Sequence, residues 1–388
     1  MIEKPIPYGH QFISDDDIQE VVKVLKSDYL TCGPKIPEFE EAFRQYVGNP
    51  IYAVAVANAT DALHLSAHAL GVREGVNVIC TPLTFASSAN CIKMCGGHVD
   101  FCDVDNDTYL MDLDKLQQML AAKPKGYYSG IVFVDFAGYP GDMEKLRAIA
   151  DEYGCWILED ACHAPGGYFT DSKGEKVYCG NCKYVDVTVF SFHPVKHITT
   201  GEGGMLVTNR EDIYKSASIC RTHGITHEAS EMEKFDGNWY YEMVELGWNY
   251  RITDMQAALG TSQLKRARKN VEKRRELVRK YNEAFKDVKG IKTPFEAADV
   301  YHAYHLYIIQ VEDRKGLYDF LRSQGIYAQV LYYPLHLMPY YKQFGSKEGD
   351  LPVVEEYYKH CLALPMYPTL TNDQQQYVIE KVKEFVSK

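Results

Sequence analysis

Long apolar runs are missing from this sequence of 388 residues. No stretch approaches the roughly 20 apolar residues that a membrane-spanning helix needs. The first residues, Met-Ile-Glu-Lys-Pro-Ile-Pro, also lack the apolar segment of a secretory signal peptide. Both absences predict a cytoplasmic protein that does not bind membranes.

Positive charge is in short supply as well. The chain carries 42 Lys and Arg against 53 Asp and Glu, which gives a formal net charge of -11. That balance argues against non-specific binding to nucleic acid or to anionic membranes. It does not exclude a phosphorylated ligand, because phosphate sites are built from local donors.

Several motifs of metal and nucleotide sites are incomplete. Asp103, Asp105 and Asp107 resemble the start of a calcium loop. However, the sixth position is Thr108 where glycine is needed, and the twelfth is Asp114 where glutamate is needed. We interpret this segment as a solvated turn. No Gly-x-Gly-x-x-Gly follows a strand in the right context, so a nicotinamide-binding fold is not indicated.

The cysteines show neither a disulfide framework nor the spacing of a zinc site. There are eleven of them, an odd number, which indicates reduced thiols in a cytosol. Cys179 and Cys182 form a lone Cys-x-x-Cys without a second pair, so a zinc or redox role for them is not favoured. We predict no metal site.

What the sequence does contain is a lysine between two short apolar strands. Strand-forming residues at 186–191 and 205–208 bracket a segment that holds Pro194, Lys196 and three glycines. A lysine on such a loop can be held out of water, which lowers its pKa and makes its amine a nucleophile for a carbonyl. That chemistry suits a Schiff base with pyridoxal phosphate (PLP), and Ser191 at the strand end can hold the cofactor's phosphate. Most lysines are solvated surface charges, so Lys196 needs partners elsewhere.

Strands alternate with helices along the first half of the chain. A helix is predicted to begin at Ser14, as an exposed amphipathic helix with Ile18, Val21, Val22 and Leu25 on one face. The alternation after it is typical of a mostly parallel sheet with helices on both faces. The length and the 46% hydrophobic content predict one large and one small domain. The expected strands are 53–56, 78–80, 98–102, 131–136 and 156–160.

A candidate anion site lies at the start of the helix that follows the first of these strands. The backbone amides of Ala59 and Thr60, together with the Thr60 hydroxyl, form such a site at a helix N-terminus. The simpler interpretation is ordinary capping by Asn58 or Thr60.

Other side chains at strand ends suit a planar cofactor. Asp160 ends a strand at the carboxyl edge of the sheet, where it can pair with a protonated pyridine nitrogen or merely cap a helix. Phe85 and His163 can lie against a ring, or they fill the core.

The last third of the chain predicts a connecting helix and a smaller α/β domain. One long helix is expected from about 253 to 288, and its basic run is interleaved with other residues, which favours a solvated face over a nucleic-acid patch. The segment from Tyr332 to Tyr340 is rich in rings, which stack on a base or sugar or form a seam between domains. The expected strands are 305–311 and 327–331, and the expected helices are 315–323, 352–361 and 373–386.

These segments together resemble the DegT/StrS family of nucleotide-sugar aminotransferases. The likeness extends over nearly the whole chain and keeps the family's order and spacing. It implies a PLP-dependent transferase of fold type I, similar to aspartate aminotransferase. A large PLP-binding domain would span 1–252, and an interdomain helix with a small C-terminal α/β domain would span 253–388. The motifs are Ala59-Thr60-Asp-Ala-Leu, Glu159-Asp160-Ala-Cys-His163, Ser191-Phe-His-Pro-Val-Lys196, Thr200-Gly-Glu-Gly-Gly204 and Trp248-Asn-Tyr-Arg-Ile-Thr-Asp254.

The resemblance also implies roles for single residues. Lys196 would bind PLP covalently, and Asp160 would pair with its pyridine nitrogen. A homodimer with shared sites would follow, because one phosphate ligand would come from the neighbouring subunit. The cofactor contacts would be Ala59, Thr60 and Ser191 at the phosphate, Phe85 and His163 near the ring, and Asn249 of the partner subunit. The sugar-nucleotide pocket would be lined by Tyr8, Leu30, Thr31, Cys32, Gly33, Tyr332, Tyr333, Pro334, Leu335 and His336.

The implied activity moves an amino group from an amino acid, glutamate in the family, to C4 of a UDP-4-keto-6-deoxy-N-acetylhexosamine. More narrowly, His163 and the segments 30–33, 191–196 and 332–336 resemble the branch that makes UDP-4-amino-4,6-dideoxy-N-acetyl-β-L-altrosamine for pseudaminic acid. Amination of another UDP- or dTDP-linked 4-keto sugar stays open, as does a non-catalytic sugar-nucleotide-binding protein. A related PLP enzyme that deoxygenates sugars is disfavoured, because that branch carries His in place of Lys196.

Three positions depart from the family pattern. His197 stands where relatives often have Asn or Pro, and His163 stands where other branches have Gln. Ala59 stands where Gly or Ser is frequent, which indicates that its backbone amide does the binding.

Overall fold

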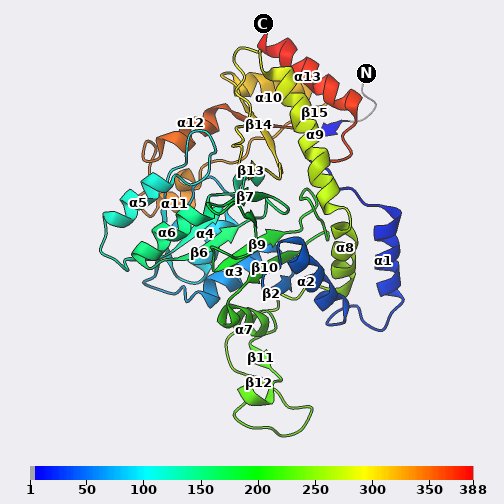
Figure 1. Cartoon of the computed structure of the whole chain (residues 1–388), viewed down its shortest axis with the longest axis vertical. Coiled ribbons are helices and arrows are strands. Elements are labelled where there is room, and N and C mark those ends of the chain that lie inside the picture. The colour runs from blue at the N-terminus through cyan, green and yellow to red at the C-terminus, as the bar shows by residue number, and fades with distance from the viewer. Residues whose placement is uncertain (1–4, 388) are drawn as a thin grey trace.

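A seven-stranded, mostly parallel sheet forms the centre of the molecule (Figure 1). The computed structural model describes residues 5–387, so the first four residues of the N-terminal segment lie outside it. One strand runs antiparallel to both of its neighbours, and the remaining pairs are parallel. This confirms the predicted α/β class. The strand order is β2 (Tyr52–Val56), β10 (Gly204–Thr208), β9 (Val187–Ser191), β6 (Trp156–Asp160), β5 (Tyr128–Val134), β3 (Asn77–Cys80) and β4 (His98–Phe101), with β10 antiparallel.

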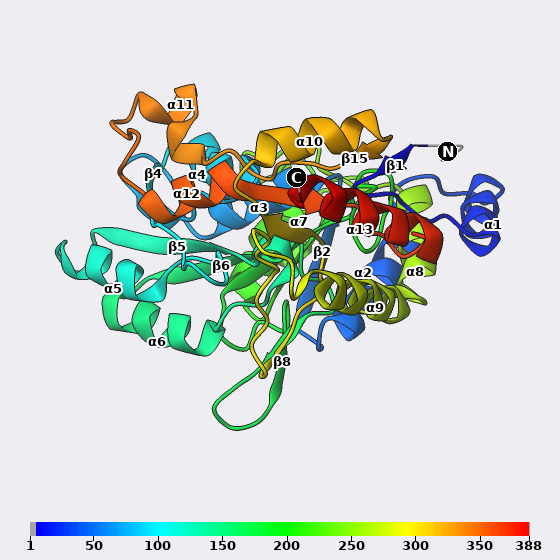
Figure 2. The same cartoon turned by 90° about the horizontal axis from the view of Figure 1, so that it is seen from above.

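Helices cover both faces of the sheet, as the alternation predicted (Figure 2). Neighbouring residues of a strand point to opposite faces. Ile131 and Ile157 therefore pack into one apolar cluster with α5 (Leu113–Ala121) and α6 (Met143–Tyr153). Val132 and Leu158 pack into a second cluster on the other face. The helices there are α3 (Ala59–Ala69), α4 (Ser87–Met94) and α7 (Glu211–Cys220).

A third apolar cluster lies in the C-terminal part of the chain. There β14 (Tyr307–Gln310) and β16 (Cys361–Leu364) pair antiparallel. Ile6 of β1 (Ile6–Pro7) belongs to this cluster, and β1 pairs with β15 (Ile326–Tyr327). Both ends of the chain therefore lie in the same region (Figure 1). The division at 252/253 stays a prediction. The surrounding helices are α9 (Ala267–Phe285), α10 (Arg314–Ser323), α12 (Pro352–His360) and α13 (Asn372–Val386).

The predicted single helix from 253 to 288 is wrong, because two helices occupy that range. α8 (Asp254–Leu264) ends before α9 begins, and Arg266 between them has non-helical backbone angles of φ -118° and ψ 4°. The Arg266 guanidinium donates to the buried carboxylate of Asp17, with Nη1 2.9 Å from Oδ1. This contact with α1 (Asp15–Leu25) joins residues 249 positions apart, so no local pattern reports it.

The interpretation of 103–107 as a solvated turn is wrong for Asp103. Its carboxylate is buried and accepts bonds from Val353 N and Val354 N at the start of α12, and from Lys115 Nζ at 2.9 Å. It therefore serves that distant helix as an N-terminal cap. Only the part around Asp105 and Asp107 is a local turn, which the bond from Asp107 N to Asp105 Oδ1 closes.

The capping prediction for the first helix is confirmed, since Ser14 caps α1 with a full capping box. Its predicted apolar face is largely open to solvent, with Ile18 49% and Leu25 56% exposed, whereas Val24 is buried. Among residues 5–387, no helix is long and apolar enough to cross a bilayer.

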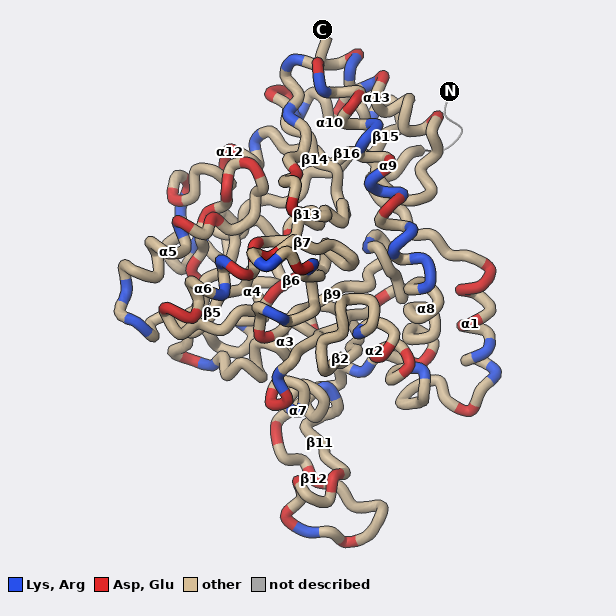
Figure 3. The backbone as a smooth tube through the Cα atoms, viewed as in Figure 1, with Lys and Arg blue, Asp and Glu red and all other residues tan. Residues whose placement is uncertain are grey.

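Lys and Arg residues alternate with acidic residues along α9 (Figure 3). Lys273 pairs with Glu276 at 2.6 Å, one turn away on the same helix. The exposed side of α9 thus has the mixed charge that the sequence indicated. The remaining described elements are α2 (Lys35–Tyr46), α11 (Pro339–Lys342), a sheet of β13 (Val300–Tyr301), β7 (Tyr168–Thr170) and β8 (Lys176–Tyr178), and the pair β11 (Ile225–Thr226) and β12 (Glu242–Met243).

Candidate active site

The loop between β9 and β10 presents Lys196 at the edge of the central sheet. Phe192 O accepts from Thr200 N and from Thr199 Oγ1, which closes the loop on itself. A Cβ added at Gly203 would meet Thr200 Oγ1 at 2.1 Å, so only glycine fits at that position. The glycines that the sequence showed here therefore let the chain fold back tightly beside the lysine.

Lys196 is half-buried, and its Nζ makes no hydrogen bond or ion pair with any residue from 5 to 387. Burial lowers the pKa of Lys196 below its usual value, while nearby Asp160 acts in the opposite direction. The guanidinium of Arg274 also lowers the pKa of Lys196. An amine in this setting has a larger neutral fraction than a surface lysine and is a better nucleophile.

Asp160 ends β6 on the same side of the sheet as Leu158, facing α4. Its carboxylate is buried and accepts two hydrogen bonds, from Ser88 Oγ to Oδ2 at 2.6 Å and from Cys162 N to Oδ1 at 3.1 Å. The charge of Asp160 also raises the pKa of Lys196, against the effect of burial. Asp160 at the end of β6 and Lys196 after β9 follow neighbouring parallel strands of the sheet, and their shared role stays a prediction.

The start of α3 offers the donors that a phosphate needs. Asn58 caps the helix by accepting from Asp61 N at 3.0 Å, which leaves Ala59 N and Thr60 N without partners in the described chain. Gly204 at the start of β10 lies against this turn, because a Cβ there would meet Asn58 O at 2.4 Å. The strand that follows the lysine loop is thereby pressed against the first turn of α3.

The groups at this site match the parts of PLP, which are a phosphate, an aldehyde and a pyridine ring. Two free amides lie at a helix N-terminus, which favours an anion such as a phosphate. The same strand pair carries Ser191 at the end of β9, in register with Gly204. An unpaired amine, which can react with an aldehyde, and a buried carboxylate, which can accept a bond from a pyridine N–H, complete the groups that a phosphorylated pyridine aldehyde requires.

Aromatic side chains enclose one side of this site. The ring of Tyr332 lies 6.4 Å from that of Phe85 and 6.2 Å from those of His163 and Phe136. Burial raises the pKa of Tyr332, and Tyr8 and Asp160 lie near enough to raise it further. Of the predicted residues, Phe85 and His163 therefore have their rings beside that of Tyr332, and Tyr8 and Asp160 both influence the Tyr332 hydroxyl.

His163 is held as a neutral imidazole in one tautomer. Its Nδ1 accepts from Ala137 N at 3.2 Å, so the ring proton belongs on Nε2, which lies 3.4 Å from the Tyr332 hydroxyl. Burial lowers the pKa of His163 well below its usual value. His163 can therefore orient the Tyr332 hydroxyl without carrying charge.

Two predicted segments lie apart from this cluster within one chain. The loop Leu30–Gly33 is fixed to the start of α8, where Gly33 N donates to Asp254 Oδ2 at 2.8 Å and Asp254 N donates to Leu30 O at 3.0 Å. Asn249 is exposed and forms an isolated bridge with Thr222. In the described chain no hydrogen bond, ion pair or ring contact joins either segment to Lys196. Their assigned roles stay predictions.

The 332–336 segment divides into residues near the site and residues of the core. Tyr333 is partly exposed, with its ring 5.0 Å from that of Tyr358. Leu335 is fully buried in the apolar cluster beneath α3 and α4, and its N–H donates to Pro82 O. His336 is buried and pairs with Glu355 at 3.0 Å. The side chains of Leu335 and His336 are thus committed to packing, whereas Pro334 connects them to the tyrosines.

Two residues near Asp160 were not predicted from the sequence. Ser88 contacts Asp160 directly, and Thr84 contacts Ser88. Thr84 Oγ1 lies 2.7 Å from Ser88 Oγ, and both side chains are buried. The only signal was their spacing of four residues across the start of a helix, which places two side chains on one face. Arg274 and His305 were missed as well, although Arg274 influences Lys196 and the His305 ring lies 4.4 Å from that of His163.

All eleven cysteines lie within the described chain and are free thiols. Cys179 lies in a buried group with Asp135 and Glu159, in which one ligand atom of each falls within 4.8 Å of the others. Cys182 Sγ contacts Thr188 Oγ1 at 3.6 Å, and Thr188 in turn donates to Glu159 at 2.5 Å. The two cysteines thus pack beside the strand that carries Asp160, on its opposite face.

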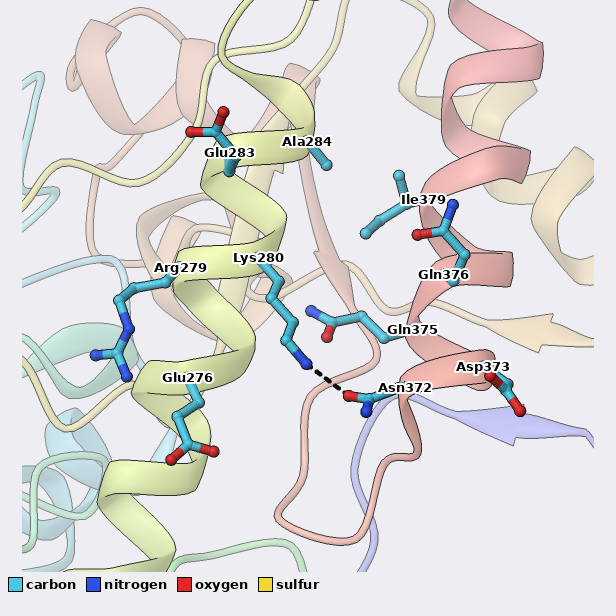
Figure 4. A pocket seen from close by; sticks show the side chains of 10 residues that line it. All are labelled: Glu276, Arg279, Lys280, Glu283, Ala284, Asn372, Asp373, Gln375, Gln376 and Ile379. Atoms are coloured by element: carbon cyan, nitrogen blue, oxygen red, sulfur yellow. Dashed lines mark hydrogen bonds between the residues drawn. The ribbon is translucent and has the colours of Figure 1, made fainter.

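A separate hollow lies between α9 and α13 (Figure 4). It has a volume of about 790 Å³ and is open to solvent. Lys280 and Arg279 share it with Glu276 and Glu283, and Lys280 Nζ bonds to Asn372 Oδ1 at 2.5 Å. None of the predicted site residues lines it, so it is distinct from the cluster around Lys196.

A model of the DegT/DnrJ/EryC1/StrS aminotransferase family matches residues 11–383. The chain belongs to this family. The match spans every residue of the cluster around Lys196 except Tyr8. The family resemblance inferred from the sequence motifs is therefore confirmed, and the protein is a sugar aminotransferase of the DegT family, whose members depend on PLP.

Curated relatives in the family cover nearly the full chain. The spore coat polysaccharide biosynthesis protein SpsC of Bacillus subtilis is 38% identical over 98% of this chain and 97% of its own. The UDP-4-amino-4,6-dideoxy-N-acetyl-beta-L-altrosamine transaminase of Campylobacter jejuni is 36% identical over 98% of this chain and 99% of its own.

Solved structures of the family have the same fold. The putative sugar aminotransferase Spr1654 from Streptococcus pneumoniae, in its PMP form, superposes with a TM-score of 0.89 at 28% identity, over 98% of this chain and 99% of its own. PseC of Helicobacter pylori, an aminotransferase of pseudaminic acid biosynthesis, superposes with a TM-score of 0.88 at 27% identity, over 99% of this chain and all of its own. Fold type I is thereby confirmed.

Proposed function

We propose that this protein transfers an amino group from L-glutamate to C4 of a UDP-4-keto-6-deoxy-N-acetylhexosamine. The proposed product is UDP-4-amino-4,6-dideoxy-N-acetyl-β-L-altrosamine, an intermediate of pseudaminic acid biosynthesis. The observation that carries the proposal is the unpaired, half-buried amine of Lys196 beside the buried carboxylate of Asp160. The Campylobacter jejuni relative supports the choice of sugar.

Each residue of the site has a distinct task in this proposal. PLP, when bound, supplies a carbonyl that condenses with amines and a ring that withdraws electrons. Ala59, Thr60 and Ser191 would hold its phosphate, and Asp160 would pair with its pyridine nitrogen. Lys196 Nζ accepts the proton that leaves the α-carbon of the donor, and later delivers a proton to C4 of the sugar.

The aromatic side chains select and shield the substrate. Phe85 is 62% exposed in the chain, so its ring is free to lie against a planar group. Tyr8, Tyr332 and Tyr333 line the side on which the sugar nucleotide enters. With substrate bound, these rings would shield the amine of Lys196, whose pKa burial already lowers.

The substrate assignment is tested by a panel of sugars. The purified protein is incubated with PLP, L-glutamate and UDP- or dTDP-linked 4-keto-6-deoxy sugars, and amino-sugar product is measured by mass spectrometry. We expect one 2-oxoglutarate per amino sugar, with the highest kcat/KM for the UDP-linked N-acetylhexosamine. Faster turnover of a dTDP sugar would overturn the choice of substrate. Failure to convert glutamate at all would favour a non-catalytic sugar-nucleotide-binding protein.

We also propose that the active unit is a homodimer in which Asn249 of the partner subunit reaches the cofactor phosphate. The lobe around β11 and β12 projects from the body of the chain (Figure 1). It exposes large apolar side chains, including Trp239 at 78% and Leu246 at 74%. Such a surface on a single chain is typical of a protein interface. Leu30–Gly33 would line the sugar-nucleotide pocket.

Mixed dimers test this sharing. One subunit carries Lys196→Ala and the other carries Asn249→Ala, with different affinity tags for isolating the mixed species. If Asn249 acts across the interface, one of the two sites regains both residues, and the mixed dimer is more active than either parent dimer. If Asn249 acts within its own chain, both sites of the mixed dimer stay defective. Turnover per dimer distinguishes the two arrangements.

A further inference from the structure

The carboxylate of Asp160 is positioned by side chains that lie outside the predicted site. Ser88 Oγ lies 2.6 Å from Oδ2, and Cys162 N lies 3.1 Å from Oδ1, so each oxygen has one donor. In residues 5–387 no Lys, Arg or His forms an ion pair with Asp160. Its orientation therefore depends on the Ser88 hydroxyl and on Cys162, whose backbone amide donates to it and whose thiol also lies beside it.

The hydrogen bonds in this group have a fixed direction. A carboxylate only accepts, so the Ser88 hydroxyl donates its single hydrogen to Asp160. The Thr84 hydroxyl, 2.7 Å from Ser88 Oγ, must then be the donor to Ser88. Ser88 is fully buried and Thr84 is 3% exposed, so water does not replace either hydroxyl. The result is a directed chain from Thr84 through Ser88 to Asp160.

A single turn of the chain supplies this group and the exposed ring beside it. Thr84 and Ser88 flank the start of α4, one helical turn apart, and Phe85 lies between them. Ser88 N donates to Phe85 O at 3.3 Å, which closes the turn. The next residues, Ala89 and Ile92, are fully buried in the apolar cluster under this face of the sheet. Ser88 is therefore anchored by packing.

We propose that Thr84 and Ser88 are positioning residues that hold the Asp160 carboxylate in its working orientation. This proposal rests on the proposed function, in which Asp160 faces the pyridine nitrogen of PLP. A carboxylate with one fixed donor on each oxygen cannot rotate freely about its Cβ–Cγ bond. Without Ser88, Oδ2 is left buried and unpaired, and the group turns away from the geometry that the reaction needs.

The test compares three substitutions of these residues. Ser88→Ala removes the donor to Asp160, and we expect kcat to fall roughly 10- to 100-fold, the usual effect of losing a buried hydrogen bond to a charged group. Thr84→Val removes the outer hydroxyl at nearly constant volume, with an expected loss of about 3- to 10-fold. Thr84→Ser keeps the hydroxyl and should restore activity. In each case KM for glutamate and for the sugar should change less than kcat.

A matched control is Ser66→Ala. Ser66 is also fully buried on a helix, but its hydroxyl bonds to Ala62 O at 2.7 Å and does not contact Asp160. This variant should keep kcat while losing similar apoprotein stability. The affinity of each apoprotein for PLP is a readout independent of turnover. It should weaken in Ser88→Ala and stay unchanged in Ser66→Ala.

Crystal structures of the apoproteins separate this proposal from the proposed function. We expect the Asp160 carboxylate to keep its orientation in Thr84→Ser and to rotate in Ser88→Ala, whether or not the protein aminates sugars. An unchanged Asp160 in Ser88→Ala, or a kcat within twofold of the parent, would overturn the positioning role. An inactive parent protein with a rotated Asp160 in Ser88→Ala would overturn the proposed function alone.

Discussion

Replacement of Lys196 by alanine is expected to abolish covalent attachment of PLP and to reduce turnover by about 10⁴-fold or more. The parent protein with PLP should show the visible absorption of cofactor bound to a lysine amine, and Lys196→Ala should not. The reason is that the cluster around Asp160 contains this one unpaired amine among residues 5–387. Absorbance spectra and a coupled assay for 2-oxoglutarate measure the two effects together.

The pH dependence of attachment gives a second measurement on Lys196. Condensation with an aldehyde requires the neutral amine, so the rate rises with pH and levels off above the pKa of the lysine. Burial lowers that pKa, so the midpoint should lie below the value of about 10.4 for a free lysine. A midpoint at the free value would contradict the desolvated setting of Lys196.

The control for this experiment is Lys269→Ala, which removes an exposed lysine of α9 far along the chain. It should leave both the spectrum and the turnover unchanged. If Lys196→Ala retained turnover while Lys269→Ala behaved in the same way, Lys196 would be an ordinary buried lysine and the assignment would fail.

The parts of the site that sequence patterns predicted are those whose geometry is local. Lys196 was found because two apolar strands and three glycines enclose it within about twenty residues, and the structure places it on that loop. Asp160 was found because it ends an apolar strand, and neighbouring parallel strands end at one edge of a sheet. Neither inference needed a contact between distant parts of the chain.

The parts that were missed depend on contacts between distant segments. Ser88 reaches Asp160 across 72 positions, and a buried serine in a helix carries no mark of that role. The strand β16 is not among the predicted strands, because its pairing with β14 is non-local. Likewise, Asp103 was interpreted as part of a local turn, although it caps a helix some 250 residues away. Burial and partner identity, which decide these cases, are properties of the folded chain.

The apolar face of α1 is another feature that the sequence pattern predicts only in part. Periodicity placed Ile18 and Leu25 on an apolar face, and both are about half exposed in the single chain. The periodicity shows that these side chains share one face of the helix, but it does not show which segment covers that face. The exposed lobe around Trp239 also lacks a partner within the described chain, and a second copy in the proposed homodimer would be one way to cover such apolar surface.

Replacement of Asp160 by asparagine is the prediction with the next largest expected effect. Asparagine keeps the size of the side chain, but Ser88 Oγ and Cys162 N donate to different carboxylate oxygens, and the amide has an oxygen at only one of those two positions. It removes the negative charge opposite the pyridine nitrogen. A nearby opposite charge shifts a pKa by about 1 to 3 units, so the ratio of protonated to neutral pyridine nitrogen should fall by roughly 10- to 1000-fold, and kcat should fall by up to that factor.

Two further variants show whether charge or packing causes that loss. Asp160→Glu keeps the charge but displaces it by one methylene group, so it should recover part of the activity if charge dominates. Asp112→Asn removes a carboxylate that caps α5 away from the site, and asparagine caps a helix equally well, so activity should persist. If Asp160→Asn were as active as the parent protein, the assignment of Asp160 to the pyridine nitrogen would be wrong. The hydrogen bonds from Thr84 to Ser88 and from Ser88 to Asp160 would then serve core packing alone. The Asp160 variants therefore also test the proposed positioning role of Thr84 and Ser88.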